Sequence, residues 1–144
     1  MTGAGTTWQL DARLKADTFP ISSLKAGELL LMNDARWLWL ILVPRLIDAQ
    51  EWHDIPEADL PDLSHCLAQV GRQLKAHTGC EKINIAAIGN MVRQLHIHII
   101  AREVGDPNWP GPVWGYGQRA AYSADEATRS VKDLQALFDD PSLY

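Results

Sequence analysis

Apolar and polar residues alternate most regularly between residues 94 and 101, where the sequence reads Gln-Leu-His-Ile-His-Ile-Ile-Ala. Strict alternation with β-branched isoleucines predicts a β-strand, because successive side chains of a strand point to opposite faces of its sheet. The odd-numbered residues of this run are all apolar and would face the core. The even-numbered residues would share the other face, which carries Gln94, His96, His98 and Ile100. Both imidazoles would therefore lie on one side of the strand, where they can reach a single small group.

The other apolar runs predict two hairpins. Residues 27–32 and 37–43 flank a turn at Asn33 and Asp34, and the second run is apolar on both faces, as in a central strand. Residues 82–88 predict a strand that turns at Gly89-Asn90 into the histidine strand. Each hairpin implies an antiparallel pair.

Helices are predicted between and after the hairpins. Apolar residues at helical spacing predict a helix from an Asp59 cap to Thr78, with Gly79 just past its end. A capping box that begins at Ser123 opens a second helix over about residues 123–138.

Near the N-terminus, residues 8–18 predict only a short helix or an irregular arm, which Phe19-Pro20 would end at or before Thr18. The order of elements then predicts an α+β fold, with an antiparallel sheet of two hairpins, a central helix and a C-terminal helix. We expect one domain over residues 1–144, with its core at about residues 8–120.

Composition narrows the choice of function. A net charge of −5 and a pI near 5.4 argue against bulk nucleic-acid binding, which needs a basic surface. Cys66 and Cys80 form no Cys-x-x-Cys motif, so we expect two reduced thiols in an intracellular protein rather than a redox or zinc motif. The first seven residues lack signal-peptide features and no apolar run could span a bilayer, which predicts a cytoplasmic protein without a membrane partner.

His96 and His98 allow three interpretations. Two polar residues on a strand are ordinarily a solvated face. A His-x-His pair is also a pair of metal ligands, although a zinc site needs a third ligand from elsewhere, and nothing in the sequence places His53, His65 or His77 nearby. The turn before the strand and the aromatic loop after it favour a reaction site, because neutral imidazole serves as a nucleophile or base.

The loop over residues 106–117 contains three prolines and cannot be a regular element. Trp109 and Trp114 in this loop would either form a wall of a pocket or pack on the core. Arg102 and Arg119 are candidates for contacting additional phosphates of a substrate, whereas Arg93 would point away from the histidines.

The histidine strand, the Asn-Asp turn, the Leu-Val-Pro end of the second predicted strand and the Gly89-Asn90 turn together resemble the histidine triad (HIT) superfamily, in particular its small bacterial members. The resemblance covers roughly residues 8–120. It implies a nucleotide hydrolase or transferase that acts at an α-phosphorus through a nucleotidyl-histidine intermediate, without a metal or other cofactor. It also implies a homodimer.

The resemblance assigns roles to particular residues. His96 matches the nucleophilic histidine and His98 the histidine that contacts the phosphate. Asn90 and Asn84 match polar residues that face the phosphate, and Asp34 matches the acidic residue that holds ribose hydroxyls. Asn90 and Asp34 are also common turn formers, so a purely structural role for each stays open.

Gln94 stands where the family has its first histidine. A glutamine amide offers both a donor and an acceptor, so it can orient a neighbour or the phosphate, but it cannot change charge. The sequence therefore leaves three hypotheses: an enzyme that uses His96, His98 and Gln94, a nucleotide-binding module with little turnover, and a metal-dependent protein that uses the His-x-His pair.

Overall fold

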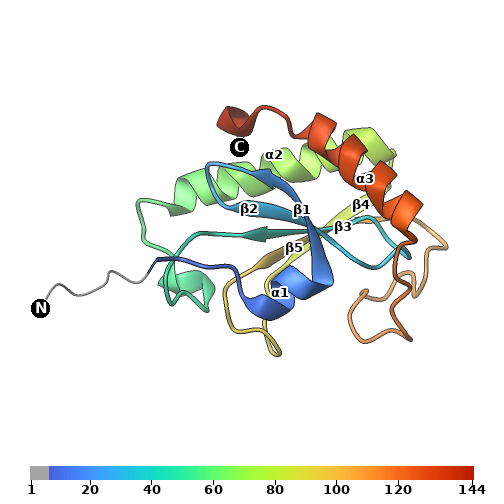
Figure 1. Cartoon of the computed structure of the whole chain (residues 1–144), viewed down its shortest axis with the longest axis horizontal. Coiled ribbons are helices and arrows are strands. Elements are labelled where there is room, and N and C mark those ends of the chain that lie inside the picture. The colour runs from blue at the N-terminus through green and yellow to red at the C-terminus, as the bar shows by residue number, and fades with distance from the viewer. Residues whose placement is uncertain (1–6) are drawn as a thin grey trace, which may run out of the picture.

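The computed structural model describes residues 7–144, so the expectation about a signal peptide falls almost wholly on residues outside the described part. The chain forms an α+β fold with a five-stranded antiparallel sheet, which confirms the predicted fold class (Figure 1). The sheet has the order β1-β2-β3-β5-β4. Its strands are β1 (Thr18–Ser23), β2 (Glu28–Met32), β3 (Trp39–Val43), β4 (Lys82–Ala86) and β5 (Ile97–Arg102). The helices are α1 (Ala12–Asp17), α2 (Leu60–Thr78) and α3 (Ala124–Leu137), with short 3-10 helices at Trp52–Asp54 and Pro141–Leu143.

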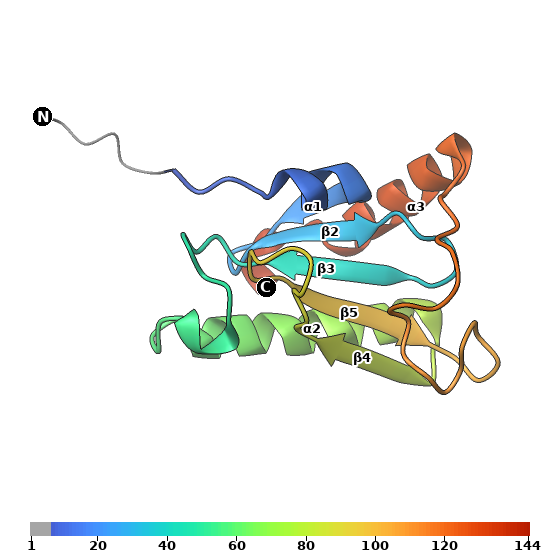
Figure 2. The same ribbon diagram turned by 90° about the horizontal axis from the view of Figure 1, so that it is seen from below.

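The central strands β2, β3 and β5 are buried on both faces, whereas the edge strands β1 and β4 are partly exposed. Helices α2 and α3 cover one face, where Leu40 and Leu42 of β3 join a core with Ile97 and Ile99 of β5 (Figures 1 and 2). Helix α1 and the loop after β5 lie on the other face of the sheet, where they pack into a second core that is rich in aromatic residues. This second core includes Leu14, Trp37, Trp39, Ile41 and Val113. Strand β3 is buried at every position, as its doubly apolar sequence predicts.

Strand β1 was not predicted. It pairs with β2 at the edge of the sheet, directly after α1, and its register shifts between Pro20 and Ser22. A proline cannot donate to a ladder, so it argues against a central strand but is tolerated at an edge or bulge. The prediction that a short helix ends before Phe19 is confirmed, since α1 ends at Asp17.

The connection between β4 and β5 is longer than the predicted turn. Strand β4 ends at Ala86 and β5 begins at Ile97, so residues 87–96 form a loop and the strand predicted from residue 94 was placed three residues too early. His96 is thus the last loop residue, although it keeps the face that the alternation gives it. Gly89 has a φ of 66°, a left-handed conformation that favours glycine, and a side chain there would crowd the carbonyl of Val92.

Both long helices have the expected ends. The capping box of α3 is present, because Glu126 N–H donates to the Ser123 hydroxyl and Ser123 N–H donates to the Glu126 carboxylate. Gly79 ends α2 with a left-handed φ of 68°. Asp59 is the N-cap residue of α2, as predicted, but its side chain makes no hydrogen bond to the first turn of the helix.

A buried ion pair fixes the loop that follows β5. The guanidinium of Arg102, which is 1% exposed, donates to both carboxylate oxygens of Asp106 at 2.7 Å and to the Asn84 amide oxygen at 3.2 Å. This ion pair and its hydrogen bonds lower the pKa of Asp106. Trp109 lies over the same guanidinium, at 5.7 Å. Arg102 therefore anchors the loop, which corrects the expectation that it contacts additional phosphates.

The cysteines and the hydropathy of the helices complete the description. Cys66 and Cys80 are free and buried, and burial raises the pKa of Cys66 to about 11, so its thiol is held in the unreactive protonated form. In the part of the chain that the structure describes, no helix has the length and apolar character needed to cross a membrane.

Candidate functional site

A cavity of about 370 Å³ opens on the face of the sheet that carries the second core, next to His96 and His98. Its walls come from α1, from the loop over residues 88–92, from β3 and β5, and from Trp114. His96 and His98 are 7% and 5% exposed, and their ring centroids are 4.9 Å apart. The two rings are therefore in contact, largely buried, and lie at the same cavity.

The backbone fixes the tautomer of His96. Its Nδ1 lies 2.7 Å from the carbonyl oxygen of Gln94. A carbonyl oxygen can only accept, so Nδ1 must carry the proton in this contact. In the neutral ring the lone pair is then at Nε2, which is the atom a nucleophile needs to present.

Trp39 fixes the opposite tautomer of His98. Its indole N–H donates to His98 Nδ1 at 2.9 Å, and indole nitrogen is a donor only. The neutral His98 ring therefore carries its proton at Nε2. Burial, together with the charge of His96, lowers the pKa of His98 to about 3, so the ring is neutral at physiological pH.

The two rings are thus chemically complementary. One presents a lone pair at Nε2 and the other presents an N–H donor at Nε2, a combination suited to attack on a phosphorus whose oxygens need a donor. Trp114 lies edge-on against His98, at 5.2 Å between centroids, and also lines the cavity. The predicted roles of wall and core packing therefore both apply to Trp114, whereas Trp109 packs on Arg102 outside this cavity.

The side chain of Gln94 points away from the cavity. Its amide oxygen accepts from Asp11 N–H at 2.9 Å, and its amide nitrogen donates to the Gln9 carbonyl at 2.9 Å. Gln94 does not line the cavity. Its contribution to His96 is its backbone carbonyl, which any residue would supply.

The three predicted substrate contacts lie in different places. Asn90 lines the cavity with the two histidines. Asn84 lies opposite Ile100 in the β4–β5 register, on the histidine face, but it does not line the cavity and its oxygen accepts from Arg102. The sequence motif thus brings His96, His98 and Asn90 together.

Asp34 is 2% exposed and lies outside this cavity. Its two carboxylate oxygens accept from the Arg36 guanidinium at 2.9 and 2.7 Å. Burial acts to raise the pKa of Asp34, but the hydrogen bonds and charge of Arg36 outweigh it and hold the pKa below its ordinary value. These contacts favour the structural role for Asp34, and its contact with ribose stays a prediction.

Sequence reasoning did not place Trp39 or α1 at the site. Trp39 lies on a predicted central strand, and only the β3–β5 register, which pairs Ile41 with His98, brings its indole to the imidazole. Helix α1 contributes Arg13, Leu14 and Asp17 to the cavity. Asp17 also pairs with Arg119 at 3.1 Å, so Arg119 lies near the cavity without lining it.

A metal site is not evident. Among residues 7–144, no group of three or more His, Cys, Asp or Glu side chains is placed to hold an ion. His53, His65 and His77 are exposed and do not line the cavity.

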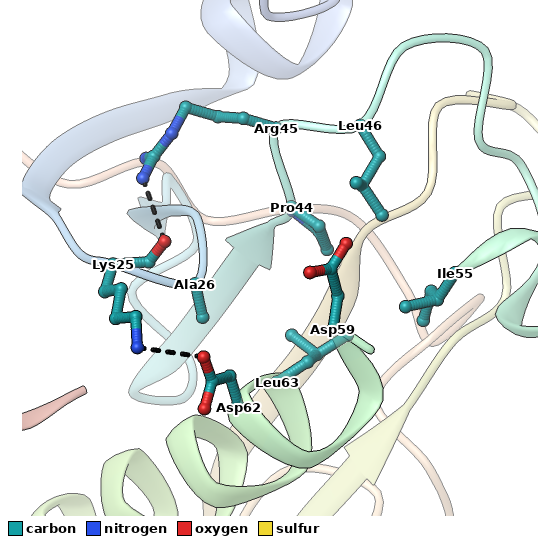
Figure 3. A pocket seen from close by; sticks show the side chains of 9 residues that line it. All are labelled: Lys25, Ala26, Pro44, Arg45, Leu46, Ile55, Asp59, Asp62 and Leu63. Carbon is teal, nitrogen blue, oxygen red and sulfur yellow. Dashed lines mark hydrogen bonds and ion pairs between the residues drawn. The ribbon is translucent and has the colours of Figure 1, made fainter. Parts of the chain in front are cut away.

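A second cavity, of about 270 Å³, surrounds the start of α2 (Figure 3). Lys25 and Asp62 form an ion pair at 2.9 Å across its edge, and Arg45 donates to the Lys25 carbonyl at 3.2 Å. Its charged groups are thus largely paired within the chain, and neither His96 nor His98 lines it.

The depressed pKa of His98 predicts a pH-dependent stability. In the unfolded chain this ring gains a proton below about pH 6.5, while the folded chain resists protonation until about pH 3. Stability contributed by neutral His98 is therefore present above pH 6.5 and lost as pH falls. We expect a loss of about 2 kcal/mol from this group between pH 6.5 and 4.5, measured by urea unfolding.

The His98→Asn variant lacks the titrating ring. The free energy of unfolding of this variant should therefore fall less over the same pH range than that of wild type. Exposed His65→Asn should follow wild type. Equal pH slopes for wild type and His98→Asn would contradict the assignment.

Comparisons with known proteins agree with this geometry. Residues 14–105 match the HIT domain family. A histidine triad protein from Sinorhizobium meliloti has a TM-score of 0.86 and 46% sequence identity, over 90% of this chain and 96% of that chain. One from Marinobacter aquaeolei has a TM-score of 0.88 and 38% identity, over 95% and 100%.

A more distant structure, the diadenosine triphosphate hydrolase of Plasmodium falciparum, has a TM-score of 0.65 over 96% of this chain and 88% of that chain. At 13% identity it shows a shared fold alone. None of the curated proteins matches the chain. The family match covers most of the chain and includes both buried histidines, so the protein belongs to the HIT domain family.

Proposed function

We propose that this protein hydrolyses or transfers a nucleoside monophosphate group, with His96 as the nucleophile at the α-phosphorus. The observation that carries the proposal is the pair of opposite tautomers in one cavity. Nε2 of His96 is free to attack because Nδ1 donates to the Gln94 carbonyl, and Nε2 of His98 is a donor because Nδ1 accepts from Trp39. The fold of the diadenosine triphosphate hydrolase and the family match support a nucleotide as the substrate.

The reaction has two displacements. Nε2 of His96 forms a bond to the α-phosphorus while the bond to the leaving group breaks, and the leaving group departs with the electron pair. Water or another hydroxyl-bearing acceptor then attacks the same phosphorus, the phosphorus–nitrogen bond breaks, and the electron pair returns to Nε2. The proton that the acceptor loses passes to the departed amine or, for a phosphate leaving group, to solvent. The first step needs no metal, because neutral imidazole is itself the nucleophile.

Charge develops at two places during the first step. The His96 ring becomes cationic, and the Gln94 carbonyl stabilises it through the Nδ1–H contact. Negative charge gathers on the phosphoryl oxygens, where the N–H of His98 can donate without carrying a charge of its own. Asn90, at the same cavity, supplies a further polar group for these oxygens.

A nucleotide-binding module with little turnover is the second candidate. The observation that favours it is that Gln94 directs its side chain to Asp11 and Gln9, so position 94 gives the cavity no side chain able to transfer a proton. The two candidates share the binding site and differ in the reactivity of His96.

We also propose that two copies associate through the edge of the sheet at β4. This strand is last in the sheet order, and Ile85 on it is 48% exposed beside α2. Unpaired edge strands with exposed apolar residues favour pairing with another chain. Sedimentation at micromolar concentration should give a dimer for wild type and a monomer for Ile85→Lys, and a monomeric wild type would overturn this proposal.

His96→Ala tests the reaction directly. Wild type should release AMP from a labelled adenosine phosphoramidate or a diadenosine polyphosphate without added metal, and a single turnover should trap an acid-labile label on the protein. His96→Ala should show neither, while His65→Ala should match wild type. If wild type and His96→Ala both bind the nucleotide tightly and neither releases AMP, the reaction is contradicted and the nucleotide-binding module is the remaining candidate.

Trp39→Phe tests the tautomer of His98. Removing the indole N–H frees Nδ1 of His98, so we expect kcat to fall roughly 10-fold, the cost of about one hydrogen bond. The acid limb of the kcat–pH profile should move to higher pH, because the donor stabilises the neutral ring. Trp37→Phe is the matched control, since its indole donates to the Pro107 carbonyl at 3.1 Å. An unmoved pH profile would contradict the proposal.

A further inference from the structure

We propose that Gln94 is a positioning residue, whose side-chain amide holds α1 in place as one wall of the histidine cavity. Through α1, Gln94 sets the affinity for substrate rather than the rate of the chemical step. This inference rests on the proposed function. It assigns to Gln94 a role different from that of a substitute for a catalytic histidine.

Both polar atoms of the Gln94 amide bind the N-terminal arm, which we define as residues 9–11. The oxygen accepts from Asp11 N–H and the nitrogen donates to the Gln9 carbonyl, each at 2.9 Å. A glutamine amide carries its donor and acceptor on one carbon, so it can bond two backbone groups that lie side by side. An imidazole at this position could satisfy only one of them, because its two nitrogens point in different directions.

The arm leads directly into α1. The Asp11 carboxylate accepts from Arg13 N–H at 2.8 Å, and the Asp11 carbonyl accepts from Lys15 N–H at 2.9 Å. Helix α1 has six residues, which is too short to be stable without tertiary contacts. The contact with Gln94 and the packing of Leu14 in the second core therefore hold it in place.

Helix α1 faces the cavity with three side chains of different character. Arg13, Leu14 and Asp17 all line it. Asp17 is paired with Arg119, whereas the guanidinium of Arg13 has no ion-pair partner among residues 7–144. A phosphate-bearing substrate in the cavity would therefore meet one unpaired cation on this wall, and displacement of α1 would weaken that contact.

The chemical step depends on another part of residue 94. The Gln94 carbonyl, not its side chain, accepts the hydrogen bond from His96 Nδ1. Replacing the side chain leaves this carbonyl in the loop before β5, whose place in the sheet is fixed by pairing with β3 and β4. Substitutions at position 94 should therefore affect KM more than kcat.

The experiment compares wild type with Gln94→Ala, Gln94→His and Arg13→Ala, using the full chain and adenosine phosphoramidate. For both Gln94 variants we expect KM to rise roughly 5- to 30-fold, as for the loss of one or two hydrogen bonds, with kcat falling less than about twofold. Amide exchange at Asp11 should quicken about tenfold or more in Gln94→Ala, which removes the acceptor, with β5 unchanged. Arg13→Ala should raise KM without altering exchange at Asp11.

Gln135→Ala, on the exposed face of α3, is the surface control and should match wild type in every measurement. A Gln94→His variant with at least tenfold higher kcat and unchanged KM would overturn the inference, because Gln94 would then be a weakened catalytic position. Unchanged Asp11 exchange in Gln94→Ala would also overturn it. If wild type turns over no substrate, the proposed reaction fails, while Asp11 exchange and the affinity for AMP still test the contact made by Gln94.

Discussion

The register between β3 and β5 is the constraint on which the site depends. It pairs Ile41 with His98 and so places the Trp39 indole diagonally against the imidazole, on the face that the second core buries. A one-residue slip would send every side chain of β5 to the opposite face. Burial then makes a charged His98 unfavourable, and the indole N–H determines which nitrogen of the neutral ring carries the proton.

The backbone and the side chain of residue 94 have different contacts, which the sequence motif does not distinguish. Its carbonyl orients His96, which needs only the correct backbone path out of the loop over residues 87–96. Its side chain contacts the arm before α1, on the other side of the residue. The glutamine at position 94, where the resemblance to the HIT superfamily leads one to expect the first histidine, therefore keeps the backbone contact with His96. The Gln94 side chain binds the arm that leads into α1, one wall of the cavity.

Two charged residues that the sequence suggests as ligand-binding, Arg102 and Asp34, instead fix loops through ion pairs. Arg102 and Asp106 hold the start of the loop that carries Trp114, and Asp34 and Arg36 hold the turn before β3. Each pair is bidentate, and three of the four side chains are less than 15% exposed. A buried charge is tolerated when it is paired and hydrogen-bonded, so these contacts lie where an unpaired partner would be costly. The aromatic wall beside His98 is thus built on ion pairs that lie outside the cavity.

The sequence by itself determined the fold class, most of the strands, both long helices and the pair of histidines on one face. It could do so because those features are local: alternation, helical spacing, a capping box and a left-handed glycine each act within a few residues. Strand β1 was not predicted, because Pro20 argues against a strand that in fact lies at the edge of the sheet. The start of β5 was predicted too early, because the alternation of polar and apolar residues continues into the preceding loop.

Tertiary structure alone decided which polar groups meet. Trp39 reaches His98 across 59 residues, and Gln94 reaches Asp11 across 83. Such contacts follow from strand register and packing, which no periodicity within a segment encodes.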